Sequence, residues 1–566
     1  MEFPTINTFM TLEWPEIKPL FEELEDQKLT SGSVEDFLGQ WSSLRKLVDE
    51  TYARLQLANA QDTTDEEAEA RYHGFLADIY PAAESADQRL KEKLLTSRLQ
   101  PEGLDVPLQK MRAEVDLFRE ENLPLMTRER MLGSEYNKIL GQQAVEWQGE
   151  ELTLVKVRSQ LRDPDRNLRE KLWRLLSNRQ LEDREAVNDL WVKLMGVRKA
   201  LASNACKGDY REFRWQQMTR LDYDPEDSRE FLDAIRQQVV PAAGRVYARY
   251  QERMGLSSVR PWDVIDNRTT FSLPAIEAFT EERDFIRTAE GIFHNLDPQL
   301  GAYFTTLREE GLLDLSNRKG KAPGAFCTSF ATRERPFIFM NAVGSSTDVR
   351  TLFHESGHAF HVLERSVLPY HHQWRPGMEF AEVASTAMEL LAAPYLEGED
   401  SFFTFEEAVR VRKGHLESKL LFWPYMAVVV DFQHWVYEHH QEASQPEACD
   451  RKWSELVDVY LPGIDWTGLE DVQATGWQRK LHIHRYPFYY IEYGLSLLGA
   501  VQIWERSLED QRDTLQRYRQ ALALGGTANL PDLYEAAGAR FAFDAGILGK
   551  AVDLIEETLV RLEDQL

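Results

Sequence analysis

The chain has 566 residues, of which 43% are hydrophobic and 28% charged, and its net charge is −28 at pH 7. A chain of this length builds two or three hydrophobic cores rather than one. The acidic balance argues against a nucleic-acid-binding protein, which needs a basic surface, and the scarcity of glycine (31) and proline (23) favours helix over strand.

Three cysteines, Cys206, Cys327 and Cys449, lie far apart in the chain. A sparse, odd set without a C-x-x-C pair is neither a disulfide framework nor a cysteine metal site, so we expect reduced thiols in a cytoplasmic protein. The first residues show no basic stretch followed by an apolar core, and no apolar run approaches the ~20 residues that cross a membrane. We therefore expect no export and no membrane partner.

The first part of the chain, residues 1–200, has the pattern of long amphipathic helices. One of them follows Ser33, an N-cap candidate, and carries Phe37 and Trp41 at helical spacing. No group of residues here has the spacing of a catalytic site. We predict a helical scaffold or lid region over 1–200 and a catalytic region over 201–566.

The strongest β signal lies in residues 319–345, where glycines and the β-rich TSFAT are followed by the apolar run PFIFMN. We predict a small sheet, with Pro336 placing one strand near its edge. Gly324 permits a close backbone approach, and an edge strand can hold an extended peptide by strand addition. The alternative is a purely structural hairpin. The candidate substrate-binding residues are Gly324, Ala325, Phe326 and Cys327.

A helix is predicted to follow, because Ser345 and Asp348 form the capping-box pattern S-x-x-D. Two turns further on lies an H-E-x-x-H sequence formed by His354, Glu355 and His358. Imidazoles at positions i and i+4 leave one helix face and can share a Zn²⁺, and the glutamate at the edge of that face can act as base on a metal-bound water. The alternative is a pair of surface histidines. Apolar neighbours instead put the motif beside a core, where polar groups need partners.

A catalytic zinc takes three protein ligands and keeps one position open. The candidates for the third ligand are Glu379, Glu382, Glu389, His371 and His372. We favour Glu382, because the small residues Ala384 and Ser385 would let its helix approach the first helix closely. Gly357, inside the first helix, is also consistent with a close neighbour. Glu389 lies on the same face and suits a hydrogen bond to a ligand imidazole, with an ordinary surface carboxylate as the alternative.

The segment 481–496, LHIHRYPFYYIEYGLS, holds two histidines and four tyrosines. Tyr490 and Tyr493 share a helix face, and His482 precedes them in a predicted loop. Phenolic hydroxyls and an imidazole can donate hydrogen bonds to the oxyanion of a tetrahedral intermediate. The alternative is a set of core aromatic residues.

Three segments, HESGHAFH, EFAEVASTAMELL and HIHRYPFYYIEY, together resemble the M3 family of zinc metallopeptidases. More narrowly they resemble its oligoendopeptidase F branch, which is related to thimet oligopeptidase and neurolysin. The segments DYREFRW, RPWD and GAFCTSF add to the resemblance, which extends from about residue 205 to the C-terminus. It implies a mainly helical, two-lobed metallopeptidase with a deep channel and a small β-sheet beside the metal helix.

The resemblance also implies roles for individual residues. One Zn²⁺ per chain would be held by His354, His358 and Glu382. Glu355 would be the general base, with Glu389 behind the ligands. The residues implied in substrate contact or oxyanion stabilisation are His482, Tyr490, Tyr486 and Tyr493. The histidine spacing differs slightly from the thimet branch, so His484 stays an alternative to His482.

The expected function is therefore that of a zinc-dependent oligoendopeptidase, which hydrolyses internal bonds of short unstructured peptides through a metal-activated water. One alternative is a zinc carboxypeptidase or dipeptidyl carboxypeptidase on the same helical body. Another, of a different class, is a non-catalytic helical peptide-binding protein. The expected partners are short peptides, without nucleic acid or membrane.

Overall fold

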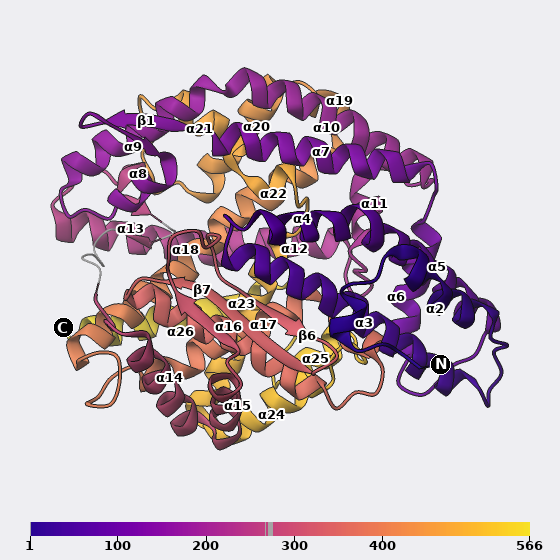
Figure 1. Cartoon of the computed structure of the whole chain (residues 1–566). Helices are drawn as coiled ribbons and strands as arrows, with labels where there is room; N and C mark the ends of the chain where they lie inside the picture. The colour runs from indigo at the N-terminus through magenta and orange to yellow at the C-terminus, as the bar shows by residue number, and fades with distance from the viewer. Residues whose placement is uncertain (1, 266–267, 270–275) are drawn as a thin grey trace. The chain divides into compact units, whose positions relative to one another are not determined.

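The computed structural model describes residues 2–265, 268–269 and 276–566 (Figure 1). Helices hold 70% of the residues and strands 6%, which confirms the predicted mainly helical fold with a small sheet. Among the described residues, none of the helices combines the length and hydrophobicity that a membrane span requires.

The chain divides into two compact units, and each is built from three separate segments. Unit 1 comprises Met1–Asp116, Glu277–Thr404 and Gly499–Phe541, and unit 2 comprises Leu117–Ile276, Phe405–Leu498 and Ala542–Leu566. Each unit thus takes residues from both sides of position 200, where the sequence pattern changes. In unit 1 the reason is long-range packing: the helix of residues Val34–Gln61 contacts the strand Phe326–Phe330 of the sheet that precedes the H-E-x-x-H helix.

Unit 1 consists of helices and a three-stranded sheet. Its helices are α1 (Ile6–Phe9), α2 (Trp14–Asp26), α3 (Val34–Gln61), α4 (Glu66–Gly74), α5 (Tyr80–Ser97), α6 (Asp105–Leu117), α14 (Glu282–Leu296), α15 (Pro298–Glu309), α16 (Ser346–Arg365), α17 (Met378–Ala392), α24 (Gln511–Ala523) and α25 (Leu530–Ala536). Its strands are β5 (Leu313–Ser316), β6 (Phe326–Phe330) and β7 (Arg335–Ala342).

Among its described residues, unit 2 is helical apart from two short pairs of antiparallel strands. Its helices are α7 (Asn122–Gly141), α8 (Leu154–Gln160), α9 (Arg166–Glu182), α10 (Arg184–Asn204), α11 (Tyr210–Gln217), α12 (Pro225–Ala234), α13 (Val240–Met254), α18 (Phe405–Glu438), α19 (His440–Ala443), α20 (Pro446–Tyr460), α21 (Glu470–Ala474), α22 (Leu481–His484) and α26 (Ala545–Glu563). Its strands are β1 (Ala144–Trp147), β2 (Glu150–Thr153), β3 (Val264–Ile265) and β4 (Arg268–Thr269). The long helix α23 (Tyr490–Glu509) begins in unit 2 and ends in unit 1.

The amphipathic pattern of the first helices corresponds to a buried core. Helix α3 begins directly after Ser33, as predicted, and both Phe37 and Trp41 are fully buried. The indole nitrogen of Trp41 donates a hydrogen bond of 2.8 Å to Asp87 on α5. This bond satisfies the one polar atom that burial of the indole takes out of water.

The strand order of the sheet in unit 1 is β5-β7-β6. Strand β7 pairs in parallel with β5 and antiparallel with β6, so it is the central strand and β6 lies at an edge. The prediction that Pro336 marks an edge strand is wrong, because it lies in β7. Pairing with β5 begins only at Ile338, so the proline faces a neighbouring strand on one side alone and breaks no bond to β5.

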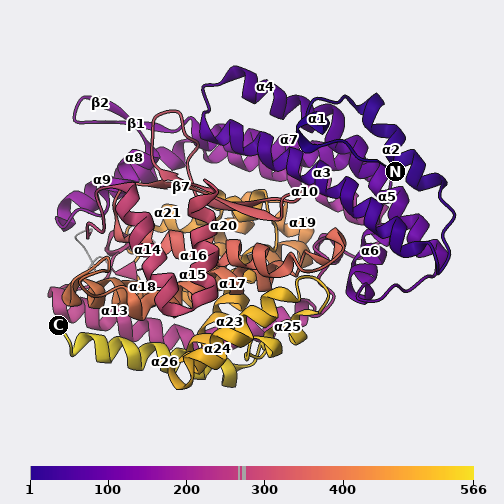
Figure 2. The same cartoon turned by 60° about the horizontal axis from the view of Figure 1, so that its bottom comes forward.

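Helix α16, which carries the H-E-x-x-H sequence, packs against β6 and β7 and also against α17 and α24. Figure 2 shows β7 lying across α16 with α17 beside it. On the β6 side the sheet is also contacted by α3. The metal helix is therefore held between the predicted sheet and the helix that carries the favoured third ligand.

Candidate metal centre

The start of α16 fixes the position of the motif. The side chain of Ser345 accepts a hydrogen bond from the backbone N–H of Asp348, and the Asp348 carboxylate accepts one of 2.8 Å from the N–H of Ser345. The predicted capping box is thus confirmed. A capped start leaves the following turns regular, so His354 and His358 keep the i, i+4 spacing that puts both imidazoles on one face.

The contact between α16 and α17 depends on Gly357. A Cβ at this position would lie 2.6 Å from the carbonyl oxygen of Ala384 and 2.6 Å from the Cα of Ser385. The same carbonyl accepts a hydrogen bond of 2.7 Å from the hydroxyl of Tyr518 on α24. A side chain at 357 would push the backbone of α17 away, and with it Glu382.

We predict that Gly357→Ala lowers the free energy of unfolding by about 1–3 kcal/mol through overpacking, and that it weakens metal binding. Urea unfolding and a competition titration with a zinc chelator measure the two effects. Gly291→Ala is the matched control on α14, since a Cβ there meets no atom within 4 Å. It should be neutral or stabilise the protein by up to about 1 kcal/mol. Equal stability of Gly357→Ala and wild type would contradict the tight contact.

Three side chains converge on one point between α16 and α17. The Nε2 of His354 lies 3.5 Å from Oε2 of Glu382, and the Nε2 of His358 lies 4.0 Å from the same oxygen. One ligand atom from each of the three residues lies within 4.8 Å of the others. Two imidazole nitrogens and one carboxylate oxygen are a donor set that suits Zn²⁺ and leaves a coordination position open.

Glu389 orients one of these ligands. Its Oε1 lies 2.8 Å from Nδ1 of His354. With the proton on Nδ1 donated to this carboxylate, Nε2 carries the lone pair and faces Glu382. The hydrogen bond predicted for Glu389 is therefore present, on the side of the imidazole away from the cluster.

The charges around the cluster change its proton affinities. Burial lowers the pKa of His358 well below its usual range. For His354, burial acts in the same direction, but the hydrogen bond and charge of Glu389 outweigh it and raise the pKa. Burial raises the pKa of Glu355 to about 7, supported by Glu382 and opposed by His354. A carboxyl group with this pKa can take up and return a proton near neutral pH.

The other residues considered as third ligands lie elsewhere. The Nε2 of His371 is 3.1 Å from Asp49, and the ring of His372 lies 4.0 Å from that of Trp41. Glu379 interacts with Tyr534 of α25. Within the described part of the chain, the carboxylate grouped with the two histidines is that of Glu382.

The edge strand β6 reaches the candidate base. The backbone of Cys327 lies against the carboxylate of Glu355 and partly opposes the rise of its pKa. Gly324 precedes the strand with φ +104°, a left-handed conformation that favours glycine, and a Cβ there would meet no atom within 4 Å. The glycine is therefore required by the turn and not by a close neighbour. Ala325 and Phe326 connect this turn to Cys327.

The aromatic segment 481–496 belongs to unit 2. His482 lies in the short helix α22 and not in the predicted loop, with its ring 4.7 Å from that of Tyr490 and 6.0 Å from that of Tyr493. The ring of Tyr486 lies 6.3 Å from His482, and this tyrosine is 41% exposed. His484 is fully buried and stacked among core aromatic rings. The structure thus groups His482, and not His484, with the tyrosines.

Sequence reasoning missed two features of these regions. One is the backbone of Cys327, which a sequence pattern cannot place against a carboxylate in another element. The other is the pair Arg479 and Lys480. These two adjacent cations next to the aromatic segment 481–496, in a chain with a net charge of −28, are visible in the sequence and could have been singled out there.

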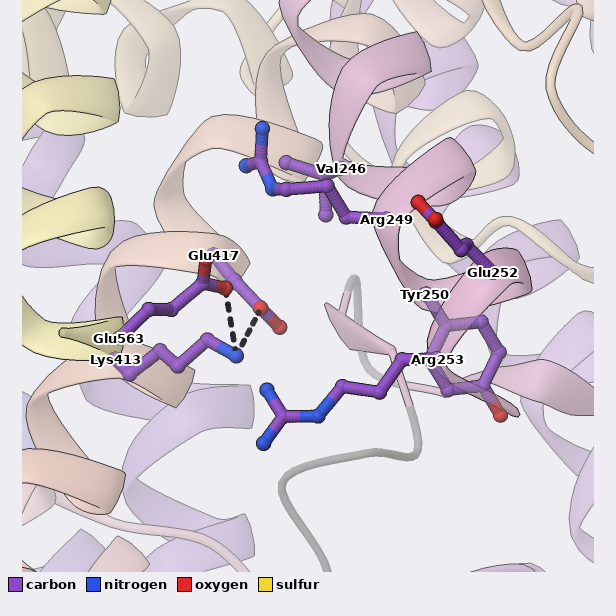
Figure 3. A pocket seen from close by; sticks show the side chains of 8 residues that line it. All are labelled: Val246, Arg249, Tyr250, Glu252, Arg253, Lys413, Glu417 and Glu563. Atoms are coloured by element: carbon purple, nitrogen blue, oxygen red, sulfur yellow. Dashed lines mark ion pairs between the residues drawn. The ribbon is translucent and has the colours of Figure 1, made fainter. Parts of the chain in front are cut away.

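Unit 2 also contains a cavity of about 270 Å³ between α13, α18 and α26 (Figure 3). Arg249 and Arg253 line it from α13. The ammonium of Lys413, whose side chain is 5% exposed, is 2.9 Å from Glu563 and 3.7 Å from Glu417. The cavity thus contains basic and acidic groups that neutralise one another, and the predicted site residues do not line it.

Comparison with known proteins identifies the family. The model of peptidase family M3 matches residues 159–552, well over half of the chain. The chain belongs to peptidase family M3. The curated relatives of this M3 peptidase include oligopeptidase PepF of Bacillus subtilis (strain 168), which is 25% identical over 282 residues. That alignment covers 47% of the chain and 40% of PepF, so the chain matches less than half of this relative's length.

Solved structures extend the similarity to the whole M3 chain. The structure of Pz peptidase A with inhibitor 2 has a TM-score of 0.87 and 26% identity, and covers 100% of this chain and 99% of its own. An oligoendopeptidase F structure has a TM-score of 0.86 and 25% identity, with 97% of each chain covered. These relatives place the M3 peptidase in the oligoendopeptidase F branch.

Proposed function

We propose that this M3 peptidase is a zinc-dependent oligoendopeptidase that hydrolyses internal bonds of short unstructured peptides. The observation that carries the proposal is the convergence of His354, His358 and Glu382, with Glu355 beside them, in a member of a peptidase family. The identity of the metal and the position of the cleaved bond are the parts that need experiment.

The three side chains would hold the metal through the Nε2 atoms of His354 and His358 and a carboxylate oxygen of Glu382. When bound, zinc supplies a Lewis acid that polarises the substrate carbonyl and lowers the pKa of a water. Glu389 keeps the imidazole of His354 in the tautomer and orientation that ligation needs.

Glu355 is the proposed general base. Its carboxylate removes a proton from the attacking water and passes it to the leaving amine. Burial raises the pKa of Glu355 above that of an exposed carboxyl group, which favours proton uptake by this side chain.

Substrate contacts complete the proposal. The segment from Gly324 to Cys327 lies at and before the edge strand β6, which can pair with an extended peptide. The family resemblance implies that four residues of unit 2 contact the substrate or stabilise the oxyanion. They are His482, Tyr490, Tyr486 and Tyr493.

Turnover of an internally quenched peptide tests this function. We expect hydrolysis by the purified protein, its loss on addition of a zinc chelator, and its return with added Zn²⁺. Parallel additions of Co²⁺ and Mn²⁺ identify the other metals that support the rate. An intact folded chain that stays inactive with zinc restored would overturn the proposal.

Two further substrates separate the alternatives. A peptide blocked at both ends, with its products identified by mass spectrometry, should be cut internally by an endopeptidase, whereas a carboxypeptidase requires a free C-terminus. Casein tests the preference for short peptides that the resemblance implies. A non-catalytic peptide-binding protein would retain the quenched peptide without cutting it.

A further inference from the structure

Lys480 is a half-buried lysine whose ammonium lies against aromatic rings. Its Nζ is 3.8 Å from the ring centroid of Tyr490 and 4.9 Å from that of Tyr425. Among the residues that the structure describes, no carboxylate forms an ion pair with this nitrogen. Burial lowers the pKa of Lys480 to about 7. Cation–π contacts alone compensate only part of the lost hydration of an ammonium.

The neighbouring Arg479 is in the same situation. Its guanidinium donates to the carbonyl oxygen of Val472 at 2.7 Å and to the hydroxyl of Thr475 at 3.3 Å, both neutral acceptors. Within the described residues it too has no carboxylate partner, and burial lowers its pKa to about 10. Arg158 of α8 adds a third positive charge, since it acts electrostatically on Arg479.

Other buried cations of unit 2 are neutralised by the chain itself. Arg220 lies 2.7 Å from Glu492, Arg198 lies 2.8 Å from Glu129, and Lys413 lies 2.9 Å from Glu563. The chain has 94 acidic residues against 66 basic ones, so carboxylates are not scarce. Buried charge without a partner is costly and is found where a ligand supplies the partner.

The position of Lys480 indicates which ligand would supply the missing negative partner. Lys480 contacts one face of Tyr490, and the same tyrosine lies 4.7 Å from His482. Lys480 therefore adjoins the residues proposed to contact the substrate. We infer that Lys480, with Arg479 next to it in the chain, forms a subsite for a carboxylate of the peptide substrate, either its C-terminal carboxylate or an Asp or Glu side chain. This inference rests on the proposed peptidase function and names a substrate feature that the function leaves open.

A series of quenched peptides of one sequence tests the subsite. The peptide is prepared as the C-terminal acid and the C-terminal amide, and each position is also varied between Asp and Asn. We expect the acid, or the Asp form at one position, to have a kcat/KM on the order of 10–100-fold above its neutral partner, as a charge-assisted contact provides. The acid–amide pair and the Asp–Asn pairs distinguish the two sources of the carboxylate.

Variants connect the preference to the residue. Lys480→Met should bring the ratio of kcat/KM values close to one, and Lys480→Arg should restore much of it. Lys199→Met, which removes an exposed lysine of α10, is the control and should leave the ratio unchanged. Circular dichroism melting curves identify any variant that fails to fold.

Two results would overturn the subsite: a wild type that does not distinguish any carboxylate from its amide, or a ratio that persists in Lys480→Met. Binding of the same peptides to the Glu355→Gln variant, followed by fluorescence anisotropy, tests the subsite independently of turnover. Carboxylate-dependent binding without hydrolysis by the wild type would contradict the proposed function and support the subsite. Binding that ignores the carboxylate would overturn the subsite alone.

Discussion

Replacing Glu355 by Gln is expected to lower the kcat of peptide hydrolysis by about 10²–10⁴-fold while zinc stays bound. The amide keeps the shape of the side chain but cannot take a proton from the attacking water. The proposed metal ligands are untouched, because the candidate cluster consists of His354, His358 and Glu382. Stopped-time assays with the quenched peptide give kcat, and atomic absorption after dialysis gives the zinc content.

The matched control is Glu364→Gln on the same helix. Glu364 is also buried, and its carboxylate pairs with Arg519 at 2.6 Å, away from the metal cluster. This variant loses an ion pair and some stability, and should keep most of the peptidase rate. If Glu355→Gln hydrolysed the peptide as fast as wild type, the assignment of the general base, and with it the enzyme mechanism, would fail.

The second large effect is expected at Glu382. Glu382→Gln should weaken zinc binding by more than the roughly 10–100-fold that loss of an outer partner such as Glu389 produces, because a charged ligand is removed. Activity should fall in parallel and recover partly at high zinc concentration. Chelator competition measures the affinity, and the activity titration shows whether the two losses have one cause.

Glu379→Gln separates the role of Glu382 from general effects on α17. Glu379 is buried on the same helix, but its electrostatic partner is Tyr534. This variant should retain zinc with near wild-type affinity. Loss of zinc in Glu379→Gln together with its retention in Glu382→Gln would show that the third ligand had been assigned to the wrong residue.

The local parts of the metal centre could be predicted from the sequence. The cap at Ser345 and the spacing of His354 and His358 are properties of one helix, and the structure has both. The choice of Glu382 as the third ligand followed from the small residues around it, since these determine how closely two helices can approach. The contact of Gly357 with the α17 backbone is the physical basis of that argument.

Long-range features could not be predicted in the same way. The assignment of Pro336 to an edge failed because β5, from an earlier part of the chain, adds to the other side of β7. The choice between His482 and His484 required burial, which depends on helices far away in sequence. Whether a carboxylate pairs with Lys480 depends on where each carboxylate of the described residues lies in the fold, so no short segment reveals that none does.

The hydrogen bond from Tyr518 to Ala384 has a consequence for synthesis of the chain. All proposed ligands and the proposed base are translated before residue 390, but α24, which supports the backbone behind Glu382, follows more than 100 residues later. Most of the chain between them, Phe405–Leu498, belongs to unit 2. Such separated contacts form late in folding. On the ribosome, the complete set of proposed metal ligands therefore exists well before the contact with α24 that supports the backbone behind Glu382.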